Sequence, residues 1–141
     1  MKKIKVVLDT NTLIVCLPEF SPWRWIIDSA INGKFILLLS TEIILEYNEK
    51  LLERYSFRYT ENILDLLTLL SNVHLINPSY KWNLIEADRD DNKFVDCALA
   101  GNSECIVSND RHFQILKKIK FPKVNILTLQ EFEGLYKDLL V

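Results

Sequence analysis

DRDDNKFVDCALAGNSECIV, residues 88–107, combines an acidic start, an apolar helical segment and a short apolar strand. Apolar residues lie on nearly every side of the segment that ends at Gly101, which is typical of a buried helix. After Glu104 the run to Val107 is apolar and ends in the β-branched pair Ile106-Val107, and it predicts a buried strand. A helix followed directly by a strand is the repeating unit of an α/β protein, so this stretch sets the expectation for the rest of the chain.

The same alternation continues along the whole chain. Further apolar runs predict strands at residues 4–8, 35–39, 73–76 and 124–127. Helices are predicted from Ser21-Pro22 to Gly33, from Ser40 or Thr41 to about Tyr55, from Thr60, from Asn109 or Asp110 to about Lys118, and from Thr128. We therefore expect one domain over residues 1–141, a three-layer α/β/α sandwich around a central, mainly parallel five-stranded sheet.

The composition is that of a globular protein. Of 141 residues, 49% are apolar and 26% are charged, a balance that argues against a disordered chain. The apolar runs are too short to cross a bilayer, and no signal-peptide pattern follows the start MKKIKVVLD, so no membrane association is expected. The cysteines at positions 16, 97 and 105 form no CxxC pair, which indicates reduced thiols and a cytoplasmic protein.

Local charge says more than the net charge of −2. Acidic residues outnumber basic ones between Glu86 and Asp96, whereas five basic residues and no acid lie between Arg111 and Lys123. An acidic cluster with a basic flank suits a metal-dependent phosphodiesterase, although two solvated surfaces would give the same pattern.

Three carboxylates are placed where they can meet at one edge of the predicted sheet. Asp9 directly follows the first strand, Asp110 follows the strand that ends at Val107, and Asp96 lies in the helix that leads into that strand. Functional groups of an open parallel sheet collect outside the carboxyl ends of its strands. The sequence therefore predicts an acidic site at this edge.

Each acid also has a structural explanation that the pattern leaves open. Asp9, Asp91 and Asp110 all stand where a helix N-cap is expected. Asp96 is harder to explain in this way, because a lone charge inside an apolar helix is costly unless something compensates it. Glu46 shares a polar stripe with Glu42, Glu49 and Glu53, so a solvent-facing position accounts for it equally well.

Four segments together resemble the PIN-domain ribonucleases, and in particular the relatives of the VapC toxins of toxin–antitoxin systems. The resemblance covers nearly the whole chain, and it implies a PIN-like fold and a metal-dependent endoribonuclease. Its segments are VVLDTN at residues 6–11, LLSTEIILEYNEKLLER at 38–54, DRDDNKFVDCALAG at 88–101 and IVSNDRHF at 106–113.

The resemblance also implies the site residues. The family's metal-binding acids correspond to Asp9, Glu46, Asp96 and Asp110, and Asp91 matches an additional catalytic acid. Ser108 stands where the family usually has Thr. Asn109 and His112 also depart from the common pattern, but neither departure removes a carboxylate.

A hard divalent cation would relieve the repulsion among so many carboxylates, and Mg²⁺ or Mn²⁺ prefers such oxygen ligands. We expect Asn11 and Ser108 to orient ligands or waters around the ion. The expected contacts to an RNA backbone come from Arg111, Lys117, Lys118 and Lys120. An antitoxin partner follows from the resemblance alone, and a homodimer would use the apolar residues 18–25.

Other protein classes fit less well. A dehalogenase-like phosphatase needs a second Asp two residues after Asp9, where this chain has Asn11. A receiver domain needs an acidic pair and a late Lys, and only Asp9 is present at the first strand. The remaining alternative is a non-catalytic PIN-like interaction module, which metal binding without RNA cleavage would reveal.

Overall fold

A five-stranded sheet lies at the centre of the molecule, in the computed structural model that describes residues 2–141. All neighbouring strands are parallel, in the order β3-β2-β1-β4-β5. The strands are β1 (Lys5–Leu8), β2 (Ile36–Leu39), β3 (Val73–Leu75), β4 (Cys105–Val107) and β5 (Ile126–Leu127). The chain winds in one direction from β1 to β3 and in the other from β4 to β5, so the strand order reverses between β1 and β4. Ligand sites of open α/β sheets lie at such a switch point.

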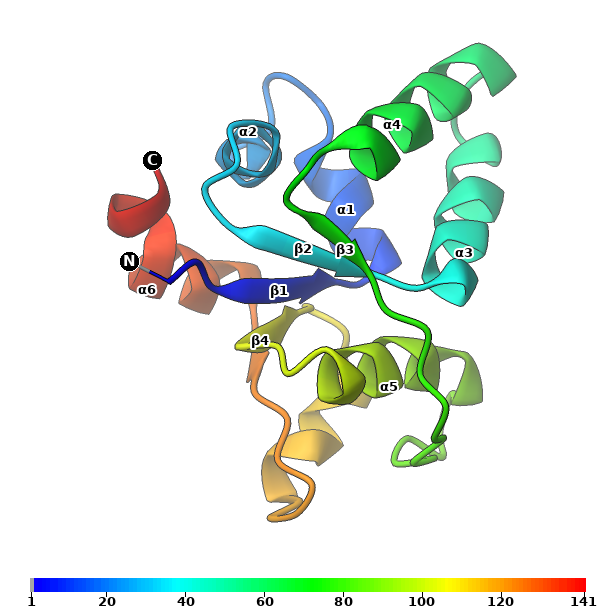
Figure 1. Ribbon diagram of the computed structural model, residues 1–141, viewed down its shortest axis with the longest axis vertical. Coiled ribbons are helices and arrows are strands. Elements are labelled where there is room, and N and C mark those ends of the chain that lie inside the picture. Colours follow the sequence, from blue (N-terminus) through cyan, green and yellow to red (C-terminus); the bar gives the residue numbers. More distant parts are fainter. Residues whose placement is uncertain (1) are drawn as a thin grey trace.

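Helices cover both faces of this sheet and confirm the predicted three-layer sandwich. In Figure 1, α1, α2 and α4 lie on one side of the sheet, and α5 lies on the other. No helix in residues 2–141 has both the length and the apolar character that a membrane span requires. The α-helices are α1 (Thr10–Cys16), α2 (Arg24–Ile31), α3 (Thr41–Leu52), α4 (Phe57–Leu69), α5 (Asn92–Ala100) and α6 (Leu129–Leu140), and the 3₁₀ helices are η1 (Arg89–Asp91) and η2 (Arg111–Lys118).

The core ties the site-bearing elements together. Central strands β1 and β4 are buried on both faces, as their unbroken apolar sequences predict. Tyr47 of α3 is fully buried, and its hydroxyl donates a hydrogen bond of 2.6 Å to the Leu8 carbonyl. Because Leu8 precedes Asp9, this bond positions α3 against the carboxyl end of β1.

The structure differs from the sequence prediction mainly at helix starts. Helix α1 was not predicted, since Thr10, Thr12 and Val15 are β-branched and favour strands. The helix predicted from Pro22 begins only at Arg24, and α4 begins at Phe57, earlier than the predicted Thr60. Segment 111–118 forms a 3₁₀ helix instead of an α-helix.

Gly101, at the end of α5, is needed for close packing. A Cβ atom built there would lie 2.6 Å from Leu38 Cδ1, 3.1 Å from the Cys97 carbonyl oxygen and 3.2 Å from Ile76 Cγ1. We expect Gly101→Ala to lower the free energy of unfolding by about 1–3 kcal/mol, the usual cost of overpacking. Urea denaturation of the purified variant measures this change.

Gly134 of α6 provides the matched control. A Cβ atom at that position meets nothing within 4 Å, and the residue lies inside a helix. Gly134→Ala should therefore raise the free energy of unfolding by about 0.5–1 kcal/mol. Equal effects of the two substitutions would contradict the packing role of Gly101.

Candidate active site

Asp9 and Ser108 meet at the switch point of the sheet. Leu8 of β1 and Val107 of β4 are register partners, so the residues that follow them are neighbours. The Ser108 hydroxyl donates a hydrogen bond to Asp9 Oδ2, and the Thr12 backbone N–H donates one of 2.7 Å to Oδ1. Asp9 is thus the N-cap of α1, which is the structural explanation given above for its position. The same hydrogen bonds hold its carboxylate at the edge of the sheet.

Asp110 is the second carboxylate at this edge. It caps η2, where its Oδ1 accepts a hydrogen bond of 2.9 Å from the His112 backbone N–H. The Ser108 hydroxyl oxygen accepts a hydrogen bond from the Asp110 backbone N–H, with 3.0 Å between oxygen and nitrogen. Ser108 is fully buried and makes hydrogen bonds with both acidic residues, through the Asp9 carboxylate and the Asp110 backbone N–H.

Asp91 brings a third carboxylate from the start of α5. Its Oδ2 atom is buried and has no hydrogen-bond partner among residues 2–141, although the residue occupies the N-cap position of the helix. His112 Nδ1 lies 3.6 Å from this oxygen and is also without a partner within the described chain. Donor atoms of Asp88, Asp91 and His112 lie within 4.8 Å of one another, a spacing that a cation could bridge.

These carboxylates surround one hollow of about 190 Å³, here called the acidic hollow. Most of its lining residues offer oxygen atoms that can act as metal ligands. One of them is Asp91, whose Oδ2 atom makes no hydrogen bond within residues 2–141. Such a donor set suits a hard ion such as Mg²⁺ or Mn²⁺. The lining residues are Asp9, Thr10, Asn11, Glu46, Lys50, Asp88, Asp90, Asp91, Phe94 and Asp110.

Glu46 also lines the acidic hollow, but both of its carboxylate oxygens already accept hydrogen bonds. The Thr10 hydroxyl donates to Oε2, and Lys93 Nζ lies 2.7 Å from Oε1. Only 17% of its side chain is exposed, so the solvent-facing alternative for Glu46 does not hold. Lys93 offsets part of the negative charge on this side of the hollow.

Asp96, which the sequence placed among the metal ligands, lies apart from Asp9, Asp91 and Asp110. It lines a separate hollow with Thr41, Glu42 and Lys81, and it does not line the acidic hollow. Its Oδ1 accepts a 3.1 Å hydrogen bond from the Trp82 backbone N–H. One turn earlier, Asn92 makes two bonds to the backbone of Ile85, so this face of α5 anchors the preceding loop. The hydrogen bond from Trp82 offsets only part of the cost of burial, which raises the pKa of Asp96.

Burial raises the pKa of the acids in this region. Desolvation is the main cause for Asp9, and the nearby Asp110 raises its pKa further, against the hydrogen bonds from Ser108 and Thr12. For Asp91, burial followed by repulsion from Asp88, Asp110 and Asp9 raises the pKa to about 7 from its usual 3.8. A bound cation would relieve this repulsion by replacing the proton.

The raised pKa of Asp91 predicts how stability depends on pH when no metal is present. Between pH 3.8 and about 7 the folded protein keeps a proton on Asp91 that the unfolded chain has lost. The contribution of Asp91 is therefore fully present at acidic pH, and it is lost as the pH rises through about 7. With EDTA present, the melting temperature should fall over this range.

Asp91→Asn is the control, because it cannot titrate and should show a smaller fall. Saturating Mg²⁺ should also reduce the fall, since an ion that binds the carboxylate stabilises the folded state. The same pH dependence in the wild type and in Asp91→Asn would contradict this assignment.

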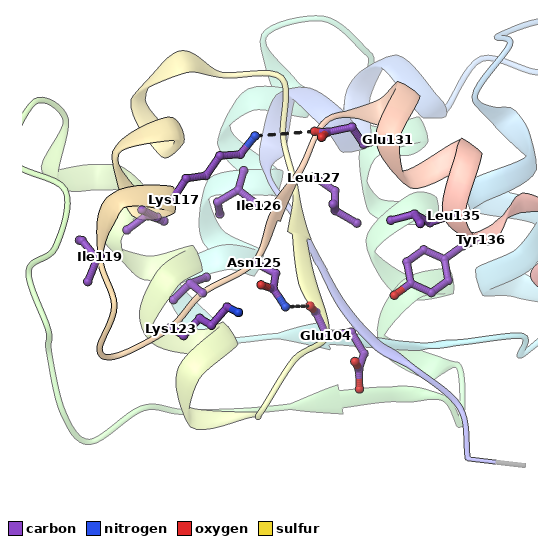
Figure 2. A pocket seen from close by; sticks show the side chains of 12 residues that line it. Glu104, Lys117, Ile119, Lys123, Asn125, Ile126, Leu127, Glu131, Leu135 and Tyr136 are labelled. Carbon is purple, nitrogen blue, oxygen red and sulfur yellow. Dashed lines mark hydrogen bonds and ion pairs between the residues drawn. The ribbon is translucent and has the colours of Figure 1, made fainter.

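The basic residues predicted to bind RNA do not form one surface. Arg111 lines a hollow together with His112, next to the acidic hollow, and Lys118 and Lys120 are exposed. Lys117 instead lines a larger hollow of about 390 Å³ between η2, β5 and α6. Figure 2 shows Lys117 reaching across this hollow to Glu131, 3.9 Å away. No residue of the acidic hollow lines it, so Lys117 faces a different part of the surface.

The sequence prediction missed several members of the acidic hollow. Asp88 was part of the quoted acidic stretch, but nothing in the pattern distinguished it from Asp90. Thr10 and Lys93 gave no signal, because their role depends on Glu46, which is 36 and 47 residues away from them. Asn11 is exposed and lines the acidic hollow together with Asp9 and Asp110.

A parallel sheet with carboxylates gathered at its switch point defines an α/β protein with a candidate site for a divalent ion. The family model of the PIN domain matches residues 5–112. An uncharacterised protein of Methanocaldococcus jannaschii is 33% identical over 134 residues, which cover 91% of this chain and 85% of that protein. The chain belongs to the PIN-domain family.

Two solved structures share the fold. VapBC2 from Rickettsia felis, solved bound to a DNA fragment from its promoter, aligns with a TM-score of 0.62 and 15% identity over 89% of this chain and 98% of that chain. The PIN domain endonuclease Utp24 aligns with a TM-score of 0.51 and 18% identity over 88% of this chain and 84% of that chain. At these identities the likeness concerns the fold.

Proposed function

We propose that this PIN-domain protein is a divalent-metal-dependent endoribonuclease. The observation that carries the proposal is the acidic hollow, in which the Asp91 oxygen is buried without a partner beside Asp9 and Asp110. Family membership supports the same reaction, since the structural relative Utp24 is an endonuclease. Cytosolic location stays a prediction, supported by three free and buried cysteines.

Asp91 would hold the ion together with Asp9 and Asp110, which line the same hollow, and with Asp88 and His112, whose donor atoms lie within 4.8 Å of one another and of an Asp91 donor atom. Glu46 would stand at the margin of the site. When bound, Mg²⁺ or Mn²⁺ supplies a water of lowered pKa and neutralises charge on the phosphate under attack. Ser108 and Thr12 keep the Asp9 carboxylate in place through their hydrogen bonds. Thr10 and Lys93 hold Glu46 in the same way and limit the net charge that an RNA phosphate meets.

Arg111 is the basic residue best placed to contact the RNA backbone, because it directly follows Asp110 and is exposed. A phosphate contact of this kind would add affinity without base preference. Lys118, the last residue of η2, and Lys120 beyond it are exposed and remain candidates, whereas the ion pair with Glu131 makes Lys117 a weaker one.

We also propose that the protein is the toxin of a type II toxin–antitoxin pair. The fold shared with VapBC2 and the sequence resemblance to the VapC group support this role. A homodimer is proposed through residues 18–25, where Phe20 is 92% exposed.

The direct test incubates the purified protein with a fluorescent single-stranded RNA. Cleavage should require Mg²⁺ or Mn²⁺, stop with EDTA and return when the ion is restored. Asp110→Asn, purified in parallel, should show no cleavage, which controls for contaminating nucleases. Metal binding by calorimetry without any cleavage would favour the non-catalytic interaction module, and no metal binding would contradict the proposed site.

A further inference from the structure

A second hollow adjoins the acidic hollow and continues it. The two share Asp9, Asn11 and Asp110, so a ligand held by the carboxylates can extend directly into the second space. The second hollow has a volume of about 240 Å³. Its remaining walls come from Thr12 and Val15 of α1, from Asn109 and from Leu129, the first residue of α6.

The wall chemistry differs sharply from that of the acidic hollow. Val15 and Leu129 make an apolar lining, in which Val15 is 46% exposed and Leu129 is 2% exposed. Asn109 is held in one orientation, because its Oδ1 accepts a 2.9 Å hydrogen bond from the Leu129 backbone N–H. Its amide nitrogen makes no hydrogen bond within residues 2–141 and remains available as a donor.

A nucleotide combines the same two kinds of chemistry in adjoining parts of one molecule. Its phosphate is attracted to a metal site, and its base has apolar faces with hydrogen-bonding groups along its edges. The volume of the hollow falls below the range of about 300–1,000 Å³ typical of drug-sized ligands, so it suits a single ring system. A charged side chain of a protein ligand would lack a partner at Val15 and Leu129.

We propose that this second hollow binds one base of the RNA, next to the phosphodiester that is cleaved. The inference rests on the proposed nuclease function and names how the substrate is read. Val15, the exposed apolar residue of the wall, contacts a face of the base, and the Asn109 amide donates to an acceptor on its edge. The hollow therefore gives the enzyme a preference for the base beside the cut.

The test is a double-mutant cycle, in which each protein variant is measured on the intact RNA and on RNAs that lack one base. A short RNA with a known cleavage position is made in versions that lack one base each, and kcat/KM is measured with Mg²⁺. For the wild type, removal of one base beside the cut should lower kcat/KM about tenfold, the size expected for one stacked base. Asn109→Ala should cleave the intact RNA more slowly and lose most of this sensitivity.

Val15→Met serves as a second variant, since it narrows the hollow while the contact between Asn109 and α6 stays intact. Asn125→Ala is the matched control, because Asn125 lines the separate hollow at β5, which shares no lining residue with the second hollow, and this variant should retain the wild-type sensitivity. Calorimetry should give the same Mg²⁺ affinity for all four proteins.

An undiminished tenfold effect in both Asn109→Ala and Val15→Met overturns the base site. So does a wild type that cleaves all base-deleted RNAs at the same rate. A wild type that cleaves no RNA with Mg²⁺ or Mn²⁺ instead overturns the proposed function itself, so the two failures are distinguishable.

Discussion

Asp91→Asn is expected to lower metal-dependent RNA cleavage by at least about a thousandfold, because the variant loses a ligand of the ion that stabilises the charge on the phosphate. Asparagine has the same shape, and the Asp91 Oδ2 atom makes no hydrogen bond to any part of residues 2–141, so the fold should persist. Single-turnover cleavage of a labelled RNA measures the loss of activity. Calorimetric titration of Mn²⁺ measures the accompanying loss of ion affinity.

The same substitution should stabilise the metal-free protein at alkaline pH. Above a pH of about 7 the Asp91 carboxylate is charged, partly buried and repelled by Asp88, Asp110 and Asp9. Asparagine removes that repulsion, so the melting temperature in EDTA should rise while activity disappears. This opposition between stability and activity is typical of a strained functional site.

Asp96→Asn is the control for this prediction. Its oxygen can still accept the hydrogen bond from the Trp82 backbone N–H, and the residue does not line the acidic hollow. Ion affinity and cleavage should stay at the wild-type level. Loss of ion binding in Asp96→Asn, with normal binding in Asp91→Asn, would restore the assignment made from sequence and reject the present one.

Phe94→Ala is expected to cause the largest loss of stability, about 3–5 kcal/mol in the free energy of unfolding. Phe94 is 1% exposed and packs edge-to-face against Phe113, with ring centroids 6.3 Å apart. This contact joins α5 to η2, the helices whose N-cap residues are Asp91 and Asp110. Urea denaturation in EDTA measures the loss without a contribution from bound metal.

Phe57→Ala provides a matched control, since Phe57 is 71% exposed at the start of α4. Its effect should stay within about 0.5 kcal/mol, as is usual for surface substitutions. If Phe94→Ala were equally mild, the α5–η2 contact would not be what holds the two sides of the acidic hollow together.

The strands and their order of appearance could be predicted from sequence, because a buried parallel strand is a continuous apolar run wherever it occurs. Helix α1 could not be predicted in this way. Its β-branched residues favour a strand, and the helix depends on the Asp9 cap and on burial of Leu13 and Cys16 against neighbouring elements. Tertiary packing thus overrides local propensity at this segment.

The site residues that follow strands could be predicted from sequence. The site residue of α5 could not, because its position depends on which face of the helix is covered. Asp9 and Asp110 follow adjacent strands, so sheet topology alone brings them together. The choice between Asp91 and Asp96 depends on which face of α5 the loop of Trp82 and Ile85 occupies. That contact is tertiary, and no pattern within residues 88–101 encodes it.

The central claim is that Asp9, Asp91 and Asp110 share one divalent ion. Anomalous diffraction at the manganese edge, from a crystal grown with Mn²⁺, tests it most directly. We predict one strong peak in the acidic hollow, within coordination distance of oxygens from all three carboxylates, and none beside Asp96. A peak beside Asp96 alone, or three carboxylates that share no ion, would contradict the account.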